Sequence, residues 1–186
     1  MNKEEFIKKY DMKEIKQIDG FVIDIIYSTP NNFTNSILYD TPICMLRTKT
    51  AEKLLKANEE LYKFGFKIKI WDAFRPYKYQ EKMWNIFPDE KFVANPKKGN
   101  CKHCKGRAVD ITLCTLNNKE VHMPTKFDHF GIESYRNNYK NLDNITKYNV
   151  LLLENTMKKY GFIPSTFEWW HFDDMDYYEI IYDIYI

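Results

Sequence analysis

Residues 107–113 read RAVDITL, and this run decides the expected architecture because its side chains alternate like those of a β-strand. The apolar residues that face one side are Val109, Ile111 and Leu113. The opposite side carries Ala108, Asp110 and Thr112. The carboxylate interrupts an otherwise apolar strand, and a buried carboxylate needs a partner. We therefore expect this strand to lie inside a sheet and to present one polar group on a buried face.

The segments around this strand predict a mixture of strands and helices. Alternating or β-branched apolar residues predict further strands at 21–26, 66–71 and 167–172. Apolar residues at helical spacing, or a proline that suits the first turn, predict helices at 48–64, 76–86 and 144–160. The residues expected at helix ends are Thr48 as an N-cap, and Gly65 and Gly161 as left-handed C-terminal residues. Turn-forming residues predict loops at 29–40 and 87–100, and a hairpin turn at Asn117 and Asn118.

The order of these elements favours an α+β fold, because strands and helices do not alternate regularly along the chain. We expect a central, largely antiparallel sheet that is flanked by helices and carries the functional site at one end. No repeat or linker divides the chain, so residues 1–186 are interpreted as a single domain. Residues 1–20 are expected to be a charged lead-in with room for one helical turn, and residues 173–186 an acidic, aromatic tail.

Composition and charge argue against several classes of protein. A net charge of +2 and a pI near 8.2 are too balanced for a nucleic-acid-binding surface. No stretch reaches the roughly 18 apolar residues of a membrane span. The first 20 residues lack the apolar run of a signal peptide, so we expect a cytoplasmic protein. In that compartment all four cysteines should be reduced thiols, namely Cys44, Cys101, Cys104 and Cys114.

Charge is uneven along the chain. Residues 96–107 carry several basic side chains and no acid, whereas residues 173–183 carry five acidic side chains and no base. Solvated surface is the simplest interpretation of both stretches. The basic stretch could in addition draw a small anionic substrate towards a nearby site.

The segment CKHCKGRAVD at 101–110 places a histidine in a glycine-containing loop that leads into the first strand. Gly106 allows a tight backbone turn, and Ala108 keeps the strand surface low beside Asp110. An ordinary strand aspartate that hydrogen-bonds to a loop would also explain this pattern. A metal ion is the alternative partner for a buried carboxylate, and it makes His103 and Asp110 candidate ligands.

The segment EWWH at 168–171 supplies a carboxylate and a histidine three residues apart. Hydrolytic zinc sites commonly use three protein ligands and leave a fourth position to water. His103, Asp110 and His171 would provide three ligands for one zinc ion per chain. Glu168 would then be free to take a proton from the attacking water. The simpler alternative is an aromatic core strand with two incidental polar residues.

The segment WDAFRP at 71–76 lies where a predicted strand meets a predicted helix. Arg75 follows the end of the strand, and a fixed guanidinium can stabilise the oxyanion that forms when water attacks a peptide carbonyl. Asp72 could orient Arg75. An ordinary Asp–Arg pair that braces the turn is the simpler alternative.

Taken together, these three segments resemble the zinc D-Ala-D-Ala metallopeptidase family, whose pattern is S-x-H-x-x-G-x-A-x-D followed by E-x-x-H. The matching positions are His103, Gly106, Ala108, Asp110, Glu168 and His171. The chain departs from the pattern at Cys101, where the family usually has serine. Within the family it is most similar to the D-alanyl-D-alanine dipeptidases, through the segments IYST at 26–29, NFT at 32–34, LY at 38–39, WDAFRP at 71–76, FVANP at 92–96 and MPTKFD at 123–128.

The resemblance implies zinc-dependent hydrolysis of D-Ala-D-Ala, a small dipeptide of cell-wall metabolism, which would serve glycopeptide resistance or dipeptide recycling. It implies that Asp128, helped by Tyr27 or Tyr39, binds the free ammonium end of the substrate, with Asp72 in the same substrate site. An anionic side chain there would favour dipeptides, because a longer chain carries no charge at that point. The sequence does not fix the oligomeric state and is compatible with a homo-oligomer.

Two other functions remain open from the sequence. The first is a peptidoglycan D,D-carboxypeptidase or an endolysin-type peptidase, although the absence of a signal peptide and of a wall-binding module argues against the carboxypeptidase in particular. The second is a non-catalytic binding domain on the same scaffold. Such a domain has no need of a base, so the presence of both Glu168 and Arg75 argues against it.

The cysteines on either side of His103 allow two further hypotheses. Cys101 and Cys104 could belong to a structural zinc site, but Cys44 and Cys114 are isolated and offer no second pair at matching spacing. Alternatively, oxidation of Cys101 and Cys104 to a disulfide would distort the loop around His103 and lower activity.

Overall fold

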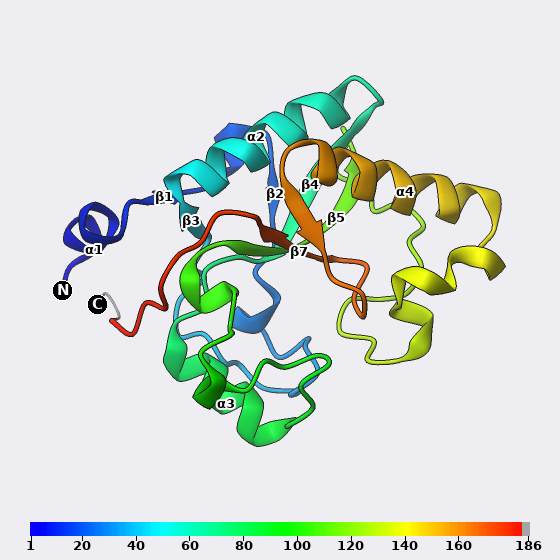
Figure 1. Cartoon of the computed structure of the whole chain (residues 1–186). Helices are drawn as coiled ribbons and strands as arrows, with labels where there is room; N and C mark the ends of the chain where they lie inside the picture. Colours follow the sequence, from blue (N-terminus) through cyan, green and yellow to red (C-terminus); the bar gives the residue numbers. More distant parts are fainter. Residues whose placement is uncertain (184–186) are drawn as a thin grey trace.

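The computed structural model describes residues 1–183, and its centre is a five-stranded sheet (Figure 1). In spatial order the strands are β2 (Val22–Ile23), β4 (Phe66–Asp72), β5 (Ala108–Thr115), β7 (His171–Asp174) and β6 (Phe162–Pro164). Strand β2 runs parallel to β4, and the other neighbouring pairs are antiparallel. The predicted α+β class with a largely antiparallel sheet is therefore confirmed, with one parallel pair at the edge.

Strand β5 is the middle strand of the sheet and is covered on both sides. Every residue of β5 except Thr115 is buried, so the polar and the apolar side chains of the alternating pattern are equally removed from solvent. Its register with β4 shifts between Ile70 and Asp72, and this irregularity brings Asp72 opposite Asp110. On its other side, Asp110 pairs with His171 of β7. The sheet thus gathers three polar residues at one end of its central strands.

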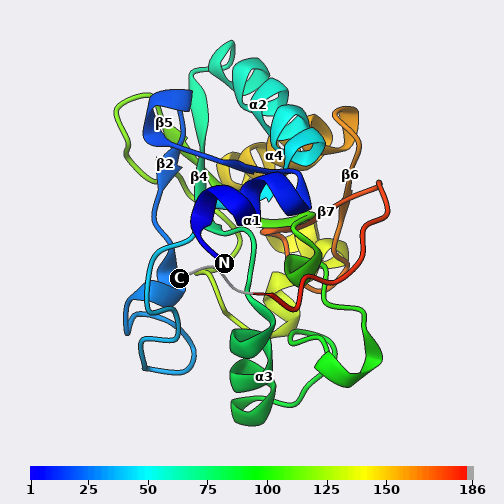
Figure 2. The ribbon, with the colours of Figure 1, turned by 90° about the vertical axis from the view of Figure 1, so that its left-hand side faces the viewer.

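Helices α2 (Thr48–Tyr62) and α4 (Asn144–Lys159) pack side by side against the sheet (Figure 1). Their apolar residues recur at helical spacing and are fully buried, namely Leu54, Ala57 and Leu61 in α2 and Val150, Leu153 and Met157 in α4. Helix α3 (Tyr77–Ile86) lies at the opposite end of the molecule from α2 (Figure 2). None of the helices within residues 1–183 combines the length and apolar character that crossing a bilayer requires.

Short elements complete the chain. They are α1 (Lys3–Tyr10), β1 (Met12–Glu14), β3 (Met45–Arg47) and the 3-10 helices Gln17–Asp19, Ile26–Ser28, Pro96–Lys98, His103–Lys105, Ile132–Ser134 and Arg136–Asn141. Strands β1 and β3 form a separate antiparallel pair. The predicted hairpin turn at Asn117 and Asn118 is present, with Asn118 at a positive φ of 64°.

The first 20 residues are more ordered than the expected lead-in. Asn2 caps α1 in a reciprocal capping box with Glu5, and Phe6 is fully buried. Phe6 belongs to a second apolar cluster, together with Met12, Ile43, Met45, Phe74 and Ile181. The apolar positions of this segment are too few to show helical periodicity by themselves, which is why the sequence indicated one helical turn and not the eight-residue helix.

Two predicted strands have different bounds. The strand expected at 21–26 is reduced to Val22–Ile23, because the chain turns into a 3-10 helix at Ile26. The strand expected at 167–172 begins only at His171 and ends at Asp174. Glu168 therefore lies in the turn before β7 and not in the strand itself.

The helix ends agree with the sequence except at Thr48. Thr48 is the first residue of α2, after Arg47 at the cap position, and its hydroxyl donates to the Asp11 carboxylate at 2.8 Å. Gly65 and Gly161 adopt the expected left-handed conformation, with φ of 81° and 85°. The N-cap of α4 is Asp143, which accepts hydrogen bonds from two backbone amides of the first turn.

The acidic end of the chain is bound to the body of the protein as far as residue 183. Asp174 is fully buried and accepts hydrogen bonds from the Thr50 hydroxyl at 2.5 Å and the Lys53 ammonium at 2.6 Å. The Arg107 guanidinium donates to the backbone carbonyl of Asp174. The interpretation of this stretch as solvated surface is therefore wrong for Asp174, and residues 184–186 of the tail lie outside the described residues.

Candidate active site

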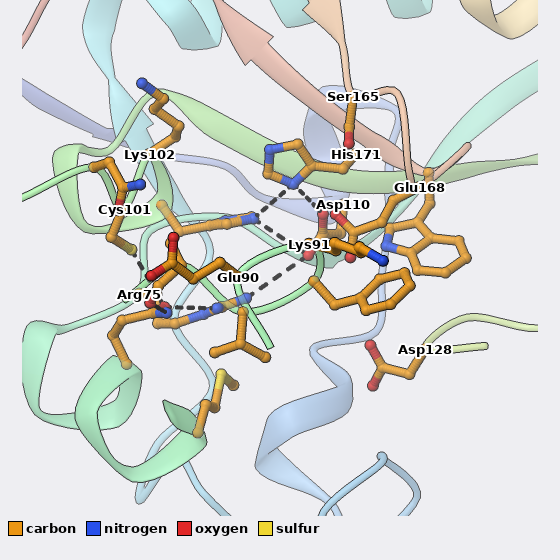
Figure 3. Close-up of a pocket in the computed structure, with 18 of the residues that line it drawn as sticks. Arg75, Glu90, Lys91, Cys101, Lys102, Asp110, Asp128, Ser165, Glu168 and His171 are labelled. Atoms are coloured by element: carbon orange, nitrogen blue, oxygen red, sulfur yellow. Dashed lines mark hydrogen bonds and ion pairs between the residues drawn. The ribbon is translucent and has the colours of Figure 1, made fainter. Parts of the chain in front are cut away.

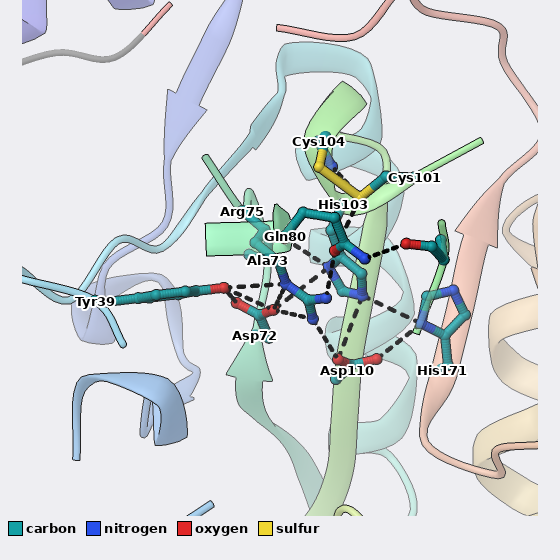
Figure 4. Close-up of a disulfide and its surroundings, with 11 residues drawn as sticks. Tyr39, Asp72, Ala73, Arg75, Gln80, Cys101, His103, Cys104, Asp110 and His171 are labelled. Atoms are coloured by element: carbon teal, nitrogen blue, oxygen red, sulfur yellow. Dashed lines mark hydrogen bonds and ion pairs between the residues drawn. A yellow bond between two sulfur atoms is a disulfide. The ribbon is translucent and has the colours of Figure 1, made fainter. Parts of the chain in front are cut away.

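Three side chains that are distant in the sequence meet at one end of the sheet. His103 begins a 3-10 helix, Asp110 belongs to β5, and His171 is the first residue of β7. Asp110 lies between the histidines: its Oδ2 is 3.3 Å from His103 Nε2, and its Oδ1 is 2.9 Å from His171 Nδ1. The two ring nitrogens are 3.2 Å apart. Figure 4 shows this cluster with all three residues labelled.

The loop before β5 fixes the position of His103. Gly106 ends the 3-10 turn at a positive φ of 70°, and a Cβ at this position would lie 3.0 Å from Met12 Cε. A residue with a side chain would therefore be both strained and crowded. The His103 Nδ1 atom is 2.7 Å from the carbonyl oxygen of Ala73, which leaves Nε2 facing Asp110.

The cluster has the dimensions of a metal site. Ligand atoms bonded to zinc at about 2.0–2.1 Å in a tetrahedron lie about 3.3 Å from one another. In this structure the two ring nitrogens are 3.2 Å apart, and with one ligand atom taken from each residue the whole set lies within 4.8 Å. The Asp110 contacts of 3.3 Å and 2.9 Å use a different carboxylate oxygen for each histidine. Two imidazoles and one carboxylate are also the donor types that hydrolytic zinc sites use. The residues therefore fit a metal ion.

The electrostatics of the cluster favour a cation. Burial acts to raise the pKa of Asp110, but the charge and hydrogen bond of His103 and the hydrogen bond of His171 outweigh it and hold that pKa well below its usual value. Burial acts to lower the pKa of His171, and hydrogen bonds to Asp110 and Asp173 outweigh it and raise that pKa. The negative charges of Asp110 and Asp173 thus stabilise positive charge at this cluster.

Glu168 lines the same cavity as the cluster. It lies in the turn before β7, and Figure 3 shows it beside Asp110 and His171 in the pocket wall. Only 9% of its surface is exposed, and burial raises the pKa of its carboxyl group to about 8. Such a carboxyl group exchanges protons near neutral pH, as a general acid–base catalyst must.

Arg75 projects from the link between β4 and α3 and is held on three sides. Its Nε and Nη2 donate to Asp72 Oδ2 at 3.0 Å and 2.7 Å, and its Nη1 donates to Gln80 Oε1 at 2.8 Å. Its Nη2 also lies 3.8 Å from Asp110 Oδ2. These contacts direct the guanidinium towards Asp110 and the two histidines (Figure 4).

Tyr39 and Asp72 lie behind Arg75 and do not line the cavity, although the sequence placed both at the substrate site. They are 1% and 0% exposed. The Tyr39 hydroxyl donates to both carboxylate oxygens of Asp72, at 2.9 Å and 3.0 Å, and accepts from Arg75 Nε at 3.2 Å. These two side chains thus hold Arg75 in place through hydrogen bonds.

The cavity beside the cluster is small, at about 190 Å³. Pockets for drug-sized ligands have volumes of roughly 300–1,000 Å³. Tyr27 and Asp128 also line the cavity: the Tyr27 ring packs against the Arg75 guanidinium, 5.2 Å from the ring centroid, and the Tyr27 hydroxyl donates to Asp128 Oδ1 at 2.9 Å. Burial raises the pKa of Asp128 to about 7. Asp128 has a positive φ of 58°, which aspartate and asparagine tolerate better than most residues.

Cys101 and Cys104 form a disulfide next to the cluster (Figure 4). The expectation of four reduced cysteines is wrong for this pair, and Cys44 and Cys114 are free and buried. The single turn at His103 brings the two Cα atoms to 5.3 Å, which lies within the range that a disulfide requires. Beside this disulfide, the ligand atoms of His103, Asp110 and His171 lie within 4.8 Å of one another.

Three supporting residues were not found from the sequence. Gln80 joins Arg75 to the loop over the cavity, because its Nε2 donates to the carbonyl of Ala94 at 2.6 Å. Arg136 holds the turn of Glu168 by donating to the Trp169 carbonyl at 2.7 Å. Asp173 contacts His171 Nε2 at 3.1 Å. The spacing of Asp173 two residues after His171 was the one available signal, because alternate strand residues share a face.

The comparison with known proteins agrees with this geometry. The family model described as D-ala-D-ala dipeptidase matches residues 8–185. The chain belongs to this family. The match confirms the resemblance inferred from the motifs, and it makes the chain an enzyme of a metallopeptidase family.

Three relatives support the assignment, and each is named D-alanyl-D-alanine dipeptidase. The protein of Escherichia coli (strain K12) is 28% identical over 151 residues, which cover 81% of this chain and 77% of the relative. The protein of Enterococcus faecalis (strain ATCC 700802 / V583) is 26% identical, and the match covers 87% of this chain and 89% of the relative. The protein of Enterococcus faecium is 27% identical, and the match covers 83% of this chain and 86% of the relative.

Proposed function

We propose that this chain hydrolyses the free dipeptide D-Ala-D-Ala with one zinc ion held by His103, Asp110 and His171. The observation that carries the proposal is the meeting of this ligand set with Glu168 in one cavity of about 190 Å³. The names of the three relatives supply the substrate. A match over residues 8–185 also supports treating the whole chain as one catalytic domain.

Zinc bound to this set would supply Lewis acidity to the scissile carbonyl and would make a nearby water more acidic. Glu168 takes a proton from the attacking water on its carboxylate and then donates that proton to the leaving amine, so that one water is consumed for each bond broken. Arg75, whose Nη2 lies 3.8 Å from Asp110 Oδ2, stabilises the negative charge that develops on the carbonyl oxygen when water attacks.

Asp128 gives the site its preference for a free dipeptide. The substrate's ammonium group binds the Asp128 carboxylate, which the Tyr27 hydroxyl orients. A blocked or longer substrate has an uncharged amide at this point, and it would leave the half-buried carboxylate without a cationic partner. Tyr39 and Asp72 contribute by holding Arg75, not by contacting the dipeptide.

The test is amino-acid release from D-Ala-D-Ala, L-Ala-L-Ala and N-acetyl-D-Ala-D-Ala, each with and without a chelator. We expect chelator-sensitive cleavage of free D-Ala-D-Ala alone. Cleavage of the acetylated peptide would move the assignment to a carboxypeptidase or an endolysin-type peptidase. Absence of cleavage of all three peptides by zinc-loaded protein would refute the proposal. We also propose a cytoplasmic location, which cell fractionation tests.

A further inference from the structure

The imidazole of His171 lies between two carboxylates, one on each ring nitrogen. Its Nδ1 is 2.9 Å from Asp110 Oδ1, and its Nε2 is 3.1 Å from Asp173 Oδ1. Asp110 belongs to the candidate ligand set, whereas Asp173 does not. Asp173 also lines the cavity. His171 Nε2 therefore has a carboxylate partner that is not a candidate metal ligand.

The strand pairing explains how Asp173 reaches His171. Residues 171 and 173 are two apart on β7, so their side chains share one face of the sheet. Across the sheet, Asp110 pairs with His171 and Ala108 pairs with Asp173. The small side chain of Ala108 leaves space on this face beside Asp173. Phe172 points to the opposite face and is fully buried, which fixes the strand in this orientation.

We propose that Asp173 is a positioning residue of the metal site, which accepts a hydrogen bond from His171 Nε2–H and so directs Nδ1 to the metal. The inference rests on the proposed zinc-dependent function. It assigns different tautomers to the two histidines, because His103 Nδ1 lies 2.7 Å from the Ala73 carbonyl oxygen, with the Asp72 carboxylate 3.7 Å away, and Nε2 is presented to the metal. His171 is held at Nε2 by a charged carboxylate and presents Nδ1.

Two features of Asp173 support this role. Within residues 1–183, His171 is the one side chain that hydrogen-bonds to the Asp173 carboxylate. The side chain is also only 22% exposed, so the interaction is little weakened by solvent. Carboxylates that hold a ligand histidine in this way fix the ring orientation and make its other nitrogen a stronger ligand.

The expected effect is on zinc affinity. Loss of such a partner typically weakens metal binding 10- to 100-fold. We therefore expect Asp173→Ala to bind zinc about 10- to 100-fold more weakly than the unmodified protein. Asp173→Asn should lie between the two, because its amide oxygen can still accept the hydrogen bond but carries no charge.

The test compares zinc affinities in competition with a chromophoric chelator, with thermal unfolding measured on the same samples. Asp176→Asn is the matched control, because it removes one negative charge from the same acidic segment and Asp176 pairs with Lys53 instead. We expect the control to bind zinc as the unmodified protein does. An Asp173→Ala affinity within twofold of the unmodified protein would overturn the inference.

A second measurement separates positioning from general support of the fold. In ¹⁵N NMR spectra of the zinc-loaded protein, His171 should carry its proton on Nε2, and this proton should exchange with water faster in Asp173→Asn. A proton on Nδ1 would overturn the inference even if the alanine variant failed to fold. If the unmodified protein bound no zinc at all, the proposed function would fail; equal binding by the Asp173 variants would refute this inference alone.

Discussion

The substitution Asp128→Asn tests the proposed ammonium site through stability as well as activity. Asparagine has nearly the same shape, tolerates the φ of 58° at this position, and can accept the 2.9 Å hydrogen bond from the Tyr27 hydroxyl. Its NH₂ group would replace the oxygen that accepts a long, 3.5 Å contact from the Phe33 amide, which is a small loss. The main change is the removal of an ionisable group.

The size of the effect follows from the pKa of Asp128. Burial raises that pKa from 3.8 to about 7, a difference that corresponds to about 4 kcal/mol of folding free energy. The residue is half-buried, so solvent screening reduces the expected value to about 2 kcal/mol. Because the pKa of Asp128 is raised in the folded state, its contribution to the free energy of unfolding is most favourable below pH 3.8. That contribution is lost as the pH rises through about 7.

The assay is urea unfolding of the metal-free protein at pH 5 and pH 8.5. The stability of Asp128→Asn relative to the unmodified protein should increase by about 1–2 kcal/mol between these two values. Asp176→Asn controls for the loss of one negative charge, since its side chain is 43% exposed. A constant difference between Asp128→Asn and the unmodified protein across this range would refute the reasoning.

The same variant has a predicted effect on activity. With no charge to bind the substrate's ammonium group, Asp128→Asn should raise KM for D-Ala-D-Ala by about 10- to 100-fold, as loss of a charged partner costs about 1.5–3 kcal/mol. In the unmodified protein, kcat/KM should fall as the pH drops below the Asp128 pKa of about 7. Observation of an unchanged KM would remove Asp128 from substrate recognition.

Three further predictions concern the proposed chemistry. Glu168→Gln should retain zinc, measured by metal analysis, and lose about 10²–10⁴ in kcat, because no base remains to accept the proton; a rate near that of the unmodified protein would contradict this role. Arg75→Lys should lower kcat about 10²–10³-fold with a smaller change in KM, since one ammonium cannot keep both the Asp72 and the Gln80 contacts while it faces the oxyanion; an effect confined to KM would contradict it. Protein with the disulfide confirmed by mass spectrometry should hydrolyse the dipeptide as fast as reduced protein, because the candidate ligand atoms lie within 4.8 Å of one another beside the disulfide. A large gain on reduction would instead support the hypothesis that oxidation lowers activity.

The local pattern of the sequence determined most of the regular structure and the identity of the candidate metal ligands. Alternation predicted β4 and β5, and apolar spacing predicted α2 and α4, because both signals depend only on which face of an element is buried. The motifs around His103, Asp110 and His171 predicted residues that the structure brings within 4.8 Å of one another. Chemically unusual residues in short motifs can be recognised without knowledge of the fold.

The tertiary structure decided the parts that depend on contacts between distant segments. The N-terminal helix packs against the body of the protein through an apolar cluster that combines Phe6 with Phe74 and Ile181. Tyr39 was expected at the substrate, and Asp72 both there and beside Arg75; the fold shows that both side chains lie behind Arg75. The disulfide required the 5.3 Å approach of two Cα atoms in one turn. Asp173 gained its contact with His171 from the pairing of β5 with β7, because the register of a sheet decides which side chains share a face.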